Sequence, residues 1–260
     1  MFVEERKKRI LDILQDQHRV TVNQLTESLP VSEATIRRDL QDLEQQGSLK
    51  RTRGGAILSH SSNFEPPFPQ KEALASEEKK YIGKLAASFL NDGDTVIIDS
   101  GTTTLQTIAH LNQKDLTVIT NSVCAITALS QKPDIRFIVA GGYNRCQSQA
   151  LVGDWTLTML KQFHANKLFL GVDGIDLIYG FTTPSIEEVA IKQQMIKCAD
   201  EVFVIADSNK FNRVTLNKVA EIEEVDYIIT DPQLSPVLAE KYTNRGVTII
   251  TKNEAAANSL

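Results

Sequence analysis

Residues that support metal and redox chemistry are scarce in this chain. Only three of its 260 residues are cysteines, and Cys124, Cys146 and Cys198 form neither a CxxC pair nor a cluster with histidine. Structural zinc sites and redox-active pairs need such spacing. We therefore predict no metal site and no cofactor, and we expect three buried free thiols.

A long hydrophobic run is also missing. Hydrophobic residues make up 42% of the chain, an ordinary share for a globular protein, but no apolar run approaches the length that spans a bilayer. The charged N-terminus MFVEERKKR is not followed by the apolar core of a signal peptide. These absences predict a cytoplasmic protein with no membrane contact.

The chain has no excess of positive charge, because its formal net charge is -5. The charge is unevenly distributed, however. Residues 1–60 carry ten Lys and Arg against nine Asp and Glu, so the acidic excess belongs to residues 61–260. Clustered arginines in the first part can therefore bind duplex DNA, although the limited electrostatic contribution would call for dimerisation.

A helix is predicted for residues 33–46. Ser32 is a suitable N-cap, Glu33 lies where the helix dipole favours an acid, and Gly47 is a natural stop. The opposite faces differ: one carries the apolar stripe Ile36, Leu40 and Leu43, and the other carries Thr35, Arg38 and Gln41 or Asp42, with Arg37 on its flank. A short, cationic N-terminal half suits a helix that enters the major groove of DNA.

Basic residues continue after this helix. In SLKRTRGGAIL, three basic residues precede the Gly54-Gly55 pair, which permits a sharp turn, so we expect a basic hairpin, the wing of a winged helix. An Arg-Arg pair alone more often marks only a solvated helix face, but its neighbours favour DNA binding here. The predicted DNA contacts are Ser32, Thr35, Arg37, Arg38, Gln41, Lys50, Arg51 and Arg53.

Two further helices are expected before the recognition helix. The first covers residues 4–17, and the second begins at a capping box formed by Thr21 and Gln24 and runs to Leu29, where Pro30 ends it. The short turn that follows sets the second helix against the third as a helix-turn-helix. We therefore assign a DNA-binding domain to residues 1–58.

The segment 59–70, SHSSNFEPPFPQ, is rich in Ser and Pro and is predicted to be an interdomain linker. A helix should follow over residues 71–90. Beyond it, the short apolar segments TVIID, LTVIT, IRFIVA, KLFLGV, VFVIAD, DYIITD and VTIIT alternate with helical stretches. Such strands are buried on both faces, so residues 71–260 should form an α/β domain with a mainly parallel sheet.

Polar residues follow nearly every predicted strand, and the carboxyl ends of parallel strands are where ligands bind. Gly, hydroxyl and helix N-terminal groups suit a phosphate, and Ser100-Gly101-Thr102-Thr103-Thr104 is the best candidate, although such loops alone are common turns. Arg145 and Lys210 could neutralise its charge. The candidate effector-binding residues are Asp99, Ser100, Gly101, Thr102, Thr103, Thr104, Asn121, Gly141, Gly142, Arg145, Asp173, Glu187 and Lys210.

The segment TIRRDLQDLEQQGSLKRTRGGA resembles the signature of the DeoR/GlpR family of bacterial sugar-operon repressors, and DSGTTT, LTVITNS, FLGVDGID and ADSNKF resemble the family's sensor domain. The resemblance implies a phosphosugar sensor with a fold similar to the sugar-phosphate isomerases and glucosamine-6-phosphate deaminases. It also implies that Ser100 to Thr104 and Lys210 hold phosphate, and that Asn121, Asp173 and Glu187 or Glu188 meet sugar hydroxyls. The family usually has DSSK where this chain has Asp207-Ser208-Asn209-Lys210, so the role of Asn209 stays open.

Phosphosugar chemistry would need a placed general base. His110 and His164 are expected within or at the ends of helices, and Asp residues after strands commonly cap helices or bind hydroxyls, so we predict no catalytic residue. The expected function is a homo-oligomeric repressor that binds a double-stranded operator and is released by a phosphorylated sugar, an amino-sugar or hexitol phosphate by its resemblance to that branch. The alternatives are an isomerase-type enzyme with an attached DNA-binding domain, and an interaction module whose N-terminal helices mediate assembly.

Overall fold

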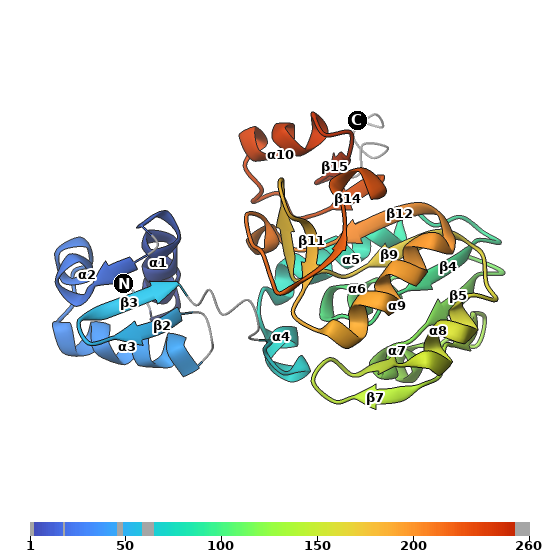
Figure 1. The fold of residues 1–260 in the computed structure, drawn as a ribbon, viewed down its shortest axis with the longest axis horizontal. Coiled ribbons are helices and arrows are strands. Elements are labelled where there is room, and N and C mark those ends of the chain that lie inside the picture. The colour runs from blue at the N-terminus through green and yellow to red at the C-terminus, as the bar shows by residue number, and fades with distance from the viewer. Residues whose placement is uncertain (1–2, 18, 46–48, 59–64, 253–260) are drawn as a thin grey trace. The chain divides into compact units, whose positions relative to one another are not determined.

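The computed structural model describes residues 3–17, 19–45, 49–58 and 65–252 (Figure 1). The chain divides into two compact units, Met1–Pro66 and Pro67–Leu260, and each unit has its own hydrophobic core. Within the described residues, no helix is both long enough and apolar enough to cross a membrane.

The smaller unit is a winged helix. Its helices are α1 (Val3–Gln17), α2 (Val22–Ser28) and α3 (Glu33–Gln45), and its strands are β1 (Arg19–Thr21), β2 (Leu49–Thr52) and β3 (Gly55–Leu58). The strands form an antiparallel sheet in the order β1-β3-β2. The capping box predicted at the start of α2 is present, because Gln24 N donates to Thr21 Oγ1 and Thr21 N donates to Gln24 Oε1.

The predicted apolar stripe of α3 faces the core of this unit. Ile36, Leu40 and Leu43 are buried and pack with residues of α1 and α2. A buried ion pair adds to this packing, since Arg6 of α1 donates from Nη2 to Asp39 Oδ1 of α3 at 3.0 Å. The side of α3 that carries its arginines is therefore left facing solvent.

The larger unit is built on a seven-stranded sheet in which every pairing is parallel, in the order β15-β14-β12-β9-β4-β5-β6. The strands are β4 (Thr95–Ile98), β5 (Thr117–Thr120), β6 (Arg136–Val139), β9 (Ala165–Leu170), β12 (Ala199–Ile205), β14 (Tyr227–Ile229) and β15 (Thr248–Ile250). Each corresponds to one of the seven predicted apolar segments. The predicted α/β class is therefore confirmed.

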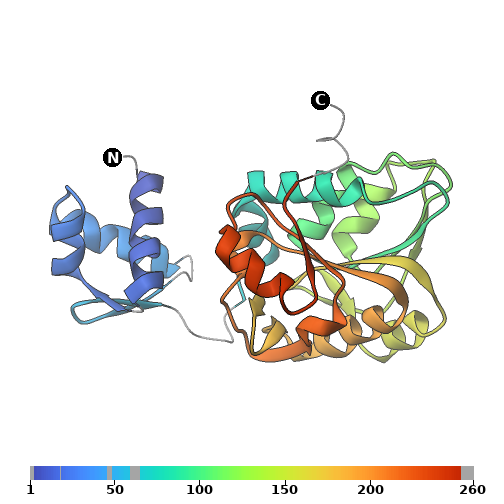
Figure 2. The ribbon, with the colours of Figure 1, turned by 90° about the horizontal axis from the view of Figure 1, so that it is seen from above.

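Helices cover both faces of this sheet (Figure 2). Alternate strand residues pack to opposite sides: Val96 and Ile98 contact α5 (Ser76–Ala87), α6 (Thr102–Ala109) and α7 (Val123–Leu129), whereas Ile97 belongs to the core shared with α8 (Asp154–Leu160), α9 (Ile186–Lys197) and α10 (Pro236–Thr243). Burial on both faces explains why the strands are almost continuously apolar.

The strand order reverses between β4 and β9. From β4 the chain builds outward through β5 and β6, and it then returns to place β9 on the other side of β4 before building outward through β12, β14 and β15. Ligands of open α/β sheets bind at such a reversal, beyond the carboxyl ends of the strands. The loops after β4 and β9 are therefore the place to look for a site.

Two antiparallel additions were not predicted. The hairpin of β7 (Tyr143–Arg145) and β8 (Ala150–Val152) follows β6, and a small sheet combines β10 (Gly174–Asp176), β11 (Gly180–Thr183) and β13 (Asn217–Ala220). Their strands have only three or four residues, too few to give a clear periodic pattern.

The helix expected over residues 71–90 is in fact two helices. α4 (Phe68–Ala73) begins inside the segment assigned to the linker, and α5 follows after a break at which Ala75 takes a left-handed conformation with φ 50°. The expectation of three buried thiols was also wrong in part: Cys198 is buried, Cys124 is half-buried, and Cys146 is exposed.

Candidate DNA-binding surface and effector site

The start of α3 has the geometry predicted for a recognition helix. Ser32 Oγ accepts a hydrogen bond from Thr35 N at 3.3 Å, which satisfies one N–H of the first turn. Arg38 and Gln41 are exposed on the solvent side, and Thr35 is half-buried. Arg37 is also exposed but donates to Glu33 Oε1 one turn earlier, from Nε at 2.8 Å. A DNA contact by Arg37 would therefore require it to leave this carboxylate, whereas Arg38 is exposed to solvent.

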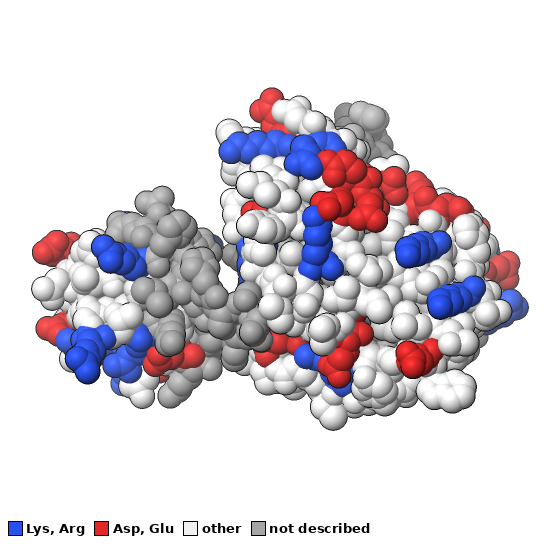
Figure 3. Space-filling model, viewed as in Figure 1, with Lys and Arg blue, Asp and Glu red and all other residues white. Residues whose placement is uncertain are grey.

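The predicted wing is the hairpin of β2 and β3, with Arg53 and Gly54 exposed at its turn. Gly55 is required by the close approach of β1, because a Cβ at this position would lie 1.9 Å from Val20 O. Arg51 is half-buried and donates from its backbone N to Glu44 Oε1 of α3 at 2.7 Å, which ties the wing to the recognition helix. The side chain of Lys50 lies outside the described residues. Figure 3 shows basic and acidic side chains interspersed on the smaller unit, in keeping with its balanced charge.

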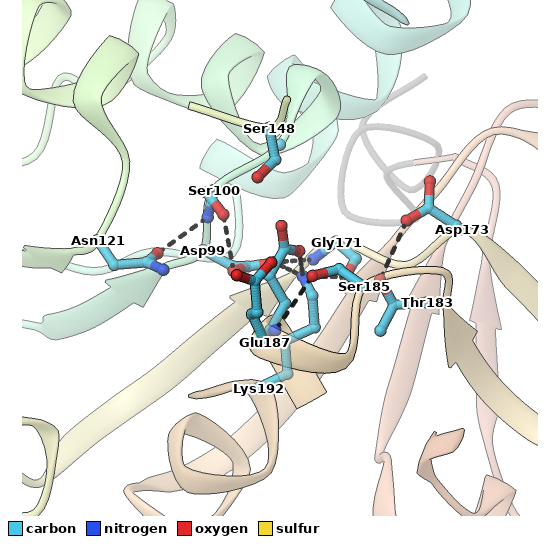
Figure 4. Close-up of polar contacts among 12 residues, drawn as sticks. Asp99, Ser100, Asn121, Ser148, Gly171, Asp173, Thr183, Ser185, Glu187 and Lys192 are labelled. Carbon is cyan, nitrogen blue, oxygen red and sulfur yellow. Dashed lines mark hydrogen bonds and ion pairs between the residues drawn. The ribbon is translucent and has the colours of Figure 1, made fainter. Parts of the chain in front are cut away.

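In the larger unit, the predicted effector residues that follow β4 and β5 come together with Gly171, which follows β9 (Figure 4). Ser100 N donates to Asn121 Oδ1 at 3.2 Å, and Asn121 Nδ2 donates to Leu151 O at 3.0 Å. Asp99 is 1% exposed and accepts from Gly171 N at 3.1 Å. The reversal of strand order thus gathers three strand ends into one hydrogen-bonded cluster.

Lys192 was missed by the sequence analysis, yet it lies at the centre of this cluster. Its Nζ donates to Asp99 Oδ2 at 2.5 Å and to Gly171 O at 3.0 Å, and Glu188 Oε2 lies 3.8 Å away. Burial would lower the pKa of Lys192, but the charges of Asp99 and Glu188 outweigh burial and raise it, so the ammonium stays charged. The sequence did contain a pattern that could have indicated Lys192. The buried stripe of α9 consists of Glu188, Ile191, Lys192 and Met195, which lie on one face at helical spacing.

The SGTTT loop leads into α6. Thr102 and Thr103 are buried in the first turn of this helix, and Gly101 precedes it. The hydroxyl of Thr104 donates to the backbone carbonyl of Asp99 at 2.7 Å, so this hydroxyl already uses its hydrogen within the protein. Ser100 Oγ lies 3.5 Å from Asp99 Oδ1. The Ser100 hydroxyl and the backbone N–H groups at the start of α6 are therefore among the groups of this loop that can donate to a ligand.

Asp173, after β9, is shared by two lysines. Lys71 Nζ of α4 donates to Asp173 Oδ1 at 2.8 Å, Lys210 Nζ lies 3.6 Å from the same oxygen, and Thr183 Oγ1 lies 3.4 Å from Oδ2. Burial favours a raised pKa, but the charges of Lys71 and Lys210 outweigh it and hold the pKa of Asp173 well below its ordinary value. Lys71 was not among the predicted residues.

A third lysine adds to the positive charge around Asp173. Burial lowers the pKa of Lys79 to about 8, and the charges of Lys210 and Lys71 contribute in the same direction. Lys210 itself follows β12 in the short helix η1 (Ser208–Lys210), where burial likewise lowers its pKa. Asp207 offsets part of this charge, since it raises the pKa of both Lys79 and Lys210, but three lysines against Asp173 and Asp207 still leave a net positive charge that suits an anion.

Arg145 connects the β7–β8 hairpin to α9. Its Nε donates to Glu187 Oε2 at 2.9 Å, and its Nη1 donates to Glu188 Oε1 and Ser148 Oγ. Of the two acids left open by the sequence, Glu187 is exposed and Glu188 is buried against Lys192. Both therefore belong to one ion-pair network that includes Arg145.

The two candidate glycines after β6 have packing contacts. Gly141 O accepts from Thr156 Oγ1 of α8 at 2.9 Å, and a Cβ on Gly142 would lie 2.2 Å from the same Thr156 Oγ1 and 2.4 Å from Val152 O of β8. Both positions thus hold the hairpin close to α8. Asn209, whose role was open, is exposed, and its backbone N donates to Asp207 Oδ1 at 3.2 Å.

The two histidines expected within or at the ends of helices lie away from the carboxyl ends of the strands, although His164 lies between α8 and β9 rather than in a helix. His110 is exposed at the end of α6, and His164 is exposed and lies 2.8 Å from Asp200. Asp207 and Asp231 accept backbone N–H groups, as helix caps do. The described residues contain no group of three or more His, Cys, Asp or Glu side chains that could hold a metal ion.

A winged helix joined to an α/β unit with a charged cluster at its strand ends defines a DNA-binding transcriptional regulator with a ligand-sensing domain. Residues 6–62 match the DeoR-like helix-turn-helix domain, and residues 74–232 match the DeoR C terminal sensor domain. The chain belongs to the DeoR family, as the resemblance of its motifs predicted.

Curated relatives agree over nearly the whole chain. It is 37% identical over 254 residues to the HTH-type transcriptional repressor GlcR of Bacillus subtilis, with 98% of each chain covered. It is 37% identical over 254 residues to a putative aga operon transcriptional repressor of Escherichia coli O157:H7, covering 96% of this chain and 94% of that one. It is 34% identical over 229 residues to the glycerol-3-phosphate regulon repressor of Escherichia coli K12, covering 87% of this chain and 90% of that one.

Among solved structures, ribose 5 phosphate isomerase A from Neisseria gonorrhoeae matches 51% of this chain and 52% of its own chain, at 14% identity and a TM-score of 0.38. This likeness is too weak to say anything about activity.

Proposed function

We propose that the protein is a homo-oligomeric repressor of a sugar-utilisation operon, which binds double-stranded operator DNA and is released by a phosphorylated sugar. The observation that carries the effector assignment is the pair of lysines, Lys71 and Lys210, on the single carboxylate Asp173. A phosphate dianion offers both ammonium groups further charged acceptors, and charge-assisted hydrogen bonds of this kind are the strong ones.

The site has two ends of different chemistry, which supports a ligand with a phosphate and a hydroxylated carbon chain. The lysines around Asp173 suit the phosphate, together with Ser100 and the first turn of α6. At the other end, Asn121, Glu187 and Glu188 offer the amide and carboxylate groups that bind hydroxyls or an amine. Asp99 and Lys192 fix the loops between these ends.

The phosphate requirement can be tested by operator release. Each charge-assisted hydrogen bond contributes about 1.5–3 kcal/mol, so two of them predict at least a hundredfold lower releasing concentration for the phosphorylated sugar than for the free one. The panel should contain galactosamine 6-phosphate, a hexitol 6-phosphate, glycerol 3-phosphate and the unphosphorylated forms, with amino-sugar or hexitol phosphates expected to act best. Equal release by free and phosphorylated forms of the best sugar would refute the phosphate site.

The proposal of a homo-oligomer follows from the operator affinity that a repressor needs. One winged helix buries too little surface to select a genomic site, so two copies should bind half-sites about 10 base pairs apart or a multiple of that spacing. Analytical ultracentrifugation at operator-binding concentrations measures this directly, and a monomeric repressor would contradict the proposal.

We infer that the chain senses its ligand without converting it. Asp99, Asp173 and Glu188, the buried acids of the site, are all held as ion-pair partners of basic side chains, whereas a general base needs a position from which it can take a proton. Incubation of the purified protein with the same panel, followed by product analysis, tests this. Turnover of any member would identify an enzyme instead.

A further inference from the structure

Helix α4 is the first helix of the larger unit, and it begins two residues after the boundary between the two units at Pro66 and Pro67. Despite its short length, it contacts three regions at the strand ends. It packs against α6, the helix that follows the SGTTT loop. The other two contacts are polar and involve its first turn and its middle.

The first turn of α4 is attached to the β7–β8 hairpin. Phe68 is buried, and its backbone N donates to Gln147 O in the hairpin loop at 2.9 Å. The same loop is held to α9 through Arg145, whose guanidinium binds Glu187 and Glu188. A displacement of α4 therefore changes the loop that covers the sugar end of the proposed site.

The middle of α4 is attached to the anion end of the site. Lys71 reaches Asp173 with its side chain, and the carbonyl of Lys71 accepts a hydrogen bond from Lys79 Nζ, which also donates to Leu74 O at 2.7 Å. One residue of α4 thus joins the carboxylate at the end of β9 to the lysine of α5.

Two ammonium groups share Asp173, and a phosphate dianion bound beside it would compete with that carboxylate for both of them. We propose that α4 is the element through which the effector controls operator binding: Lys71 exchanges Asp173 for the effector's phosphate, and the exchange shifts α4 and the chain that leads from it toward the DNA-binding unit. This regulation rests on the proposed function, because it requires the phosphate to bind beside Asp173.

Lys71 and Lys210 provide a matched pair of variants. Both contact the same carboxylate and both lose one charge on replacement by Met, but only Lys71 lies on α4. The quantity to measure is the coupling factor, the operator Kd with saturating effector divided by the operator Kd without it. Couplings between sites are typically about 5- to 150-fold. The effector is the panel member that releases the wild-type protein at the lowest concentration.

Lys210→Met should weaken effector binding, measured by calorimetry, yet keep the wild-type coupling factor once the site is saturated. Lys71→Met should instead bring the coupling factor to within about threefold of 1, even at concentrations at which calorimetry shows a filled site. A wild-type coupling factor in saturated Lys71→Met, or the same loss in both variants, would overturn the role of α4.

A second measurement uses inorganic phosphate as the probe and needs no operator. Hydrogen exchange of the peptide that covers residues 67–75 should accelerate at least about threefold in the wild-type protein when phosphate fills the site, because Lys71 leaves Asp173. In Lys71→Met the faster exchange should already be present without phosphate. Unchanged exchange in a phosphate-saturated wild-type protein would overturn the inference alone. Failure of phosphate and of every panel member to bind would refute the phosphate site itself, and the inference would fall with it.

Discussion

Replacing Lys192 by Met should destabilise the larger unit strongly. The ammonium is 3% exposed and neutralises Asp99, which is 1% exposed, so its removal leaves a buried carboxylate without a cation. Breaking a buried ion pair from one side costs about 3–5 kcal/mol. For a unit of this size, about 2–4 °C per kcal/mol applies, which predicts a fall in Tm of roughly 6–20 °C.

The assay is differential scanning calorimetry of the full chain, which separates the two units if they unfold independently. A double variant, Lys192→Met with Asp99→Asn, is the control, because it removes both charges and keeps an acceptor for Gly171 N. It should recover most of the lost stability, since a neutral pair needs no counterion.

The pH dependence gives an independent check of the cause. Burial raises the pKa of Asp99 even beside Lys192, whose charge lowers it, so the loss of Lys192 should raise this pKa further, and the folded single variant should bind a proton that the unfolded chain releases. Its stability should therefore be highest at low pH and should fall as pH rises through the raised pKa. A loss below about 1 kcal/mol, or a loss of equal size in the single and double variants, would refute the assignment of Lys192 as the counterion that Asp99 requires.

Other predictions concern the two binding functions. Arg38→Ala should cost about 1–3 kcal/mol of operator affinity if Arg38 contacts a base edge. Arg53→Ala should instead weaken the binding of all DNA sequences alike and lower the slope of log affinity against log salt by about 1. If both variants bind the operator as tightly as the wild-type protein across a salt series, the winged-helix surface is contradicted. Because the pKa of Lys79 is about 8, effector affinity should fall as pH rises from about 7 to 9, where the phosphate is already a dianion. Lys79→Met should abolish this fall in effector affinity when affinity is measured by calorimetry over the same pH range. If the fall persists in the variant, a group other than Lys79 causes it. Gly55→Ala should destabilise the smaller unit by at least about 1–3 kcal/mol, because its Cβ would overlap Val20 O, and an unchanged melting transition of that unit would show that β1 can move aside.

Local patterns in the sequence predicted the elements of both units well. The capping box at Thr21, the apolar stripe of α3 and the seven apolar strands each depend on neighbours within a few positions, so the sequence displays them directly. The expected helix over residues 71–90 was wrong because α4 is held by contacts with residues distant in the sequence, among them the ion pair of Lys71 with Asp173 and the hydrogen bond from Phe68 N to Gln147 O. No local composition marks the break at Ala75.

The candidate site was predicted in part for a related reason. Residues directly after strands, such as Asp99, Asn121 and Asp173, could be grouped because parallel strands end at one edge. Lys71 and Lys192 reach the same place from helices, and each is held there by a carboxylate that follows a distant strand. A sequence shows that a lysine lies on a helix but does not show which carboxylate will pair with it in the folded protein.

The order of the two units along the chain has a consequence for protein synthesis. The DNA-binding surface is complete once β3 ends at residue 58, whereas the site between β4 and β9 also needs Lys210, about 150 residues later. At about 5–20 residues per second, the ribosome takes roughly 8–30 s to make that stretch. A nascent chain therefore acquires the surface that contacts DNA well before it acquires the groups that would bind the releasing ligand.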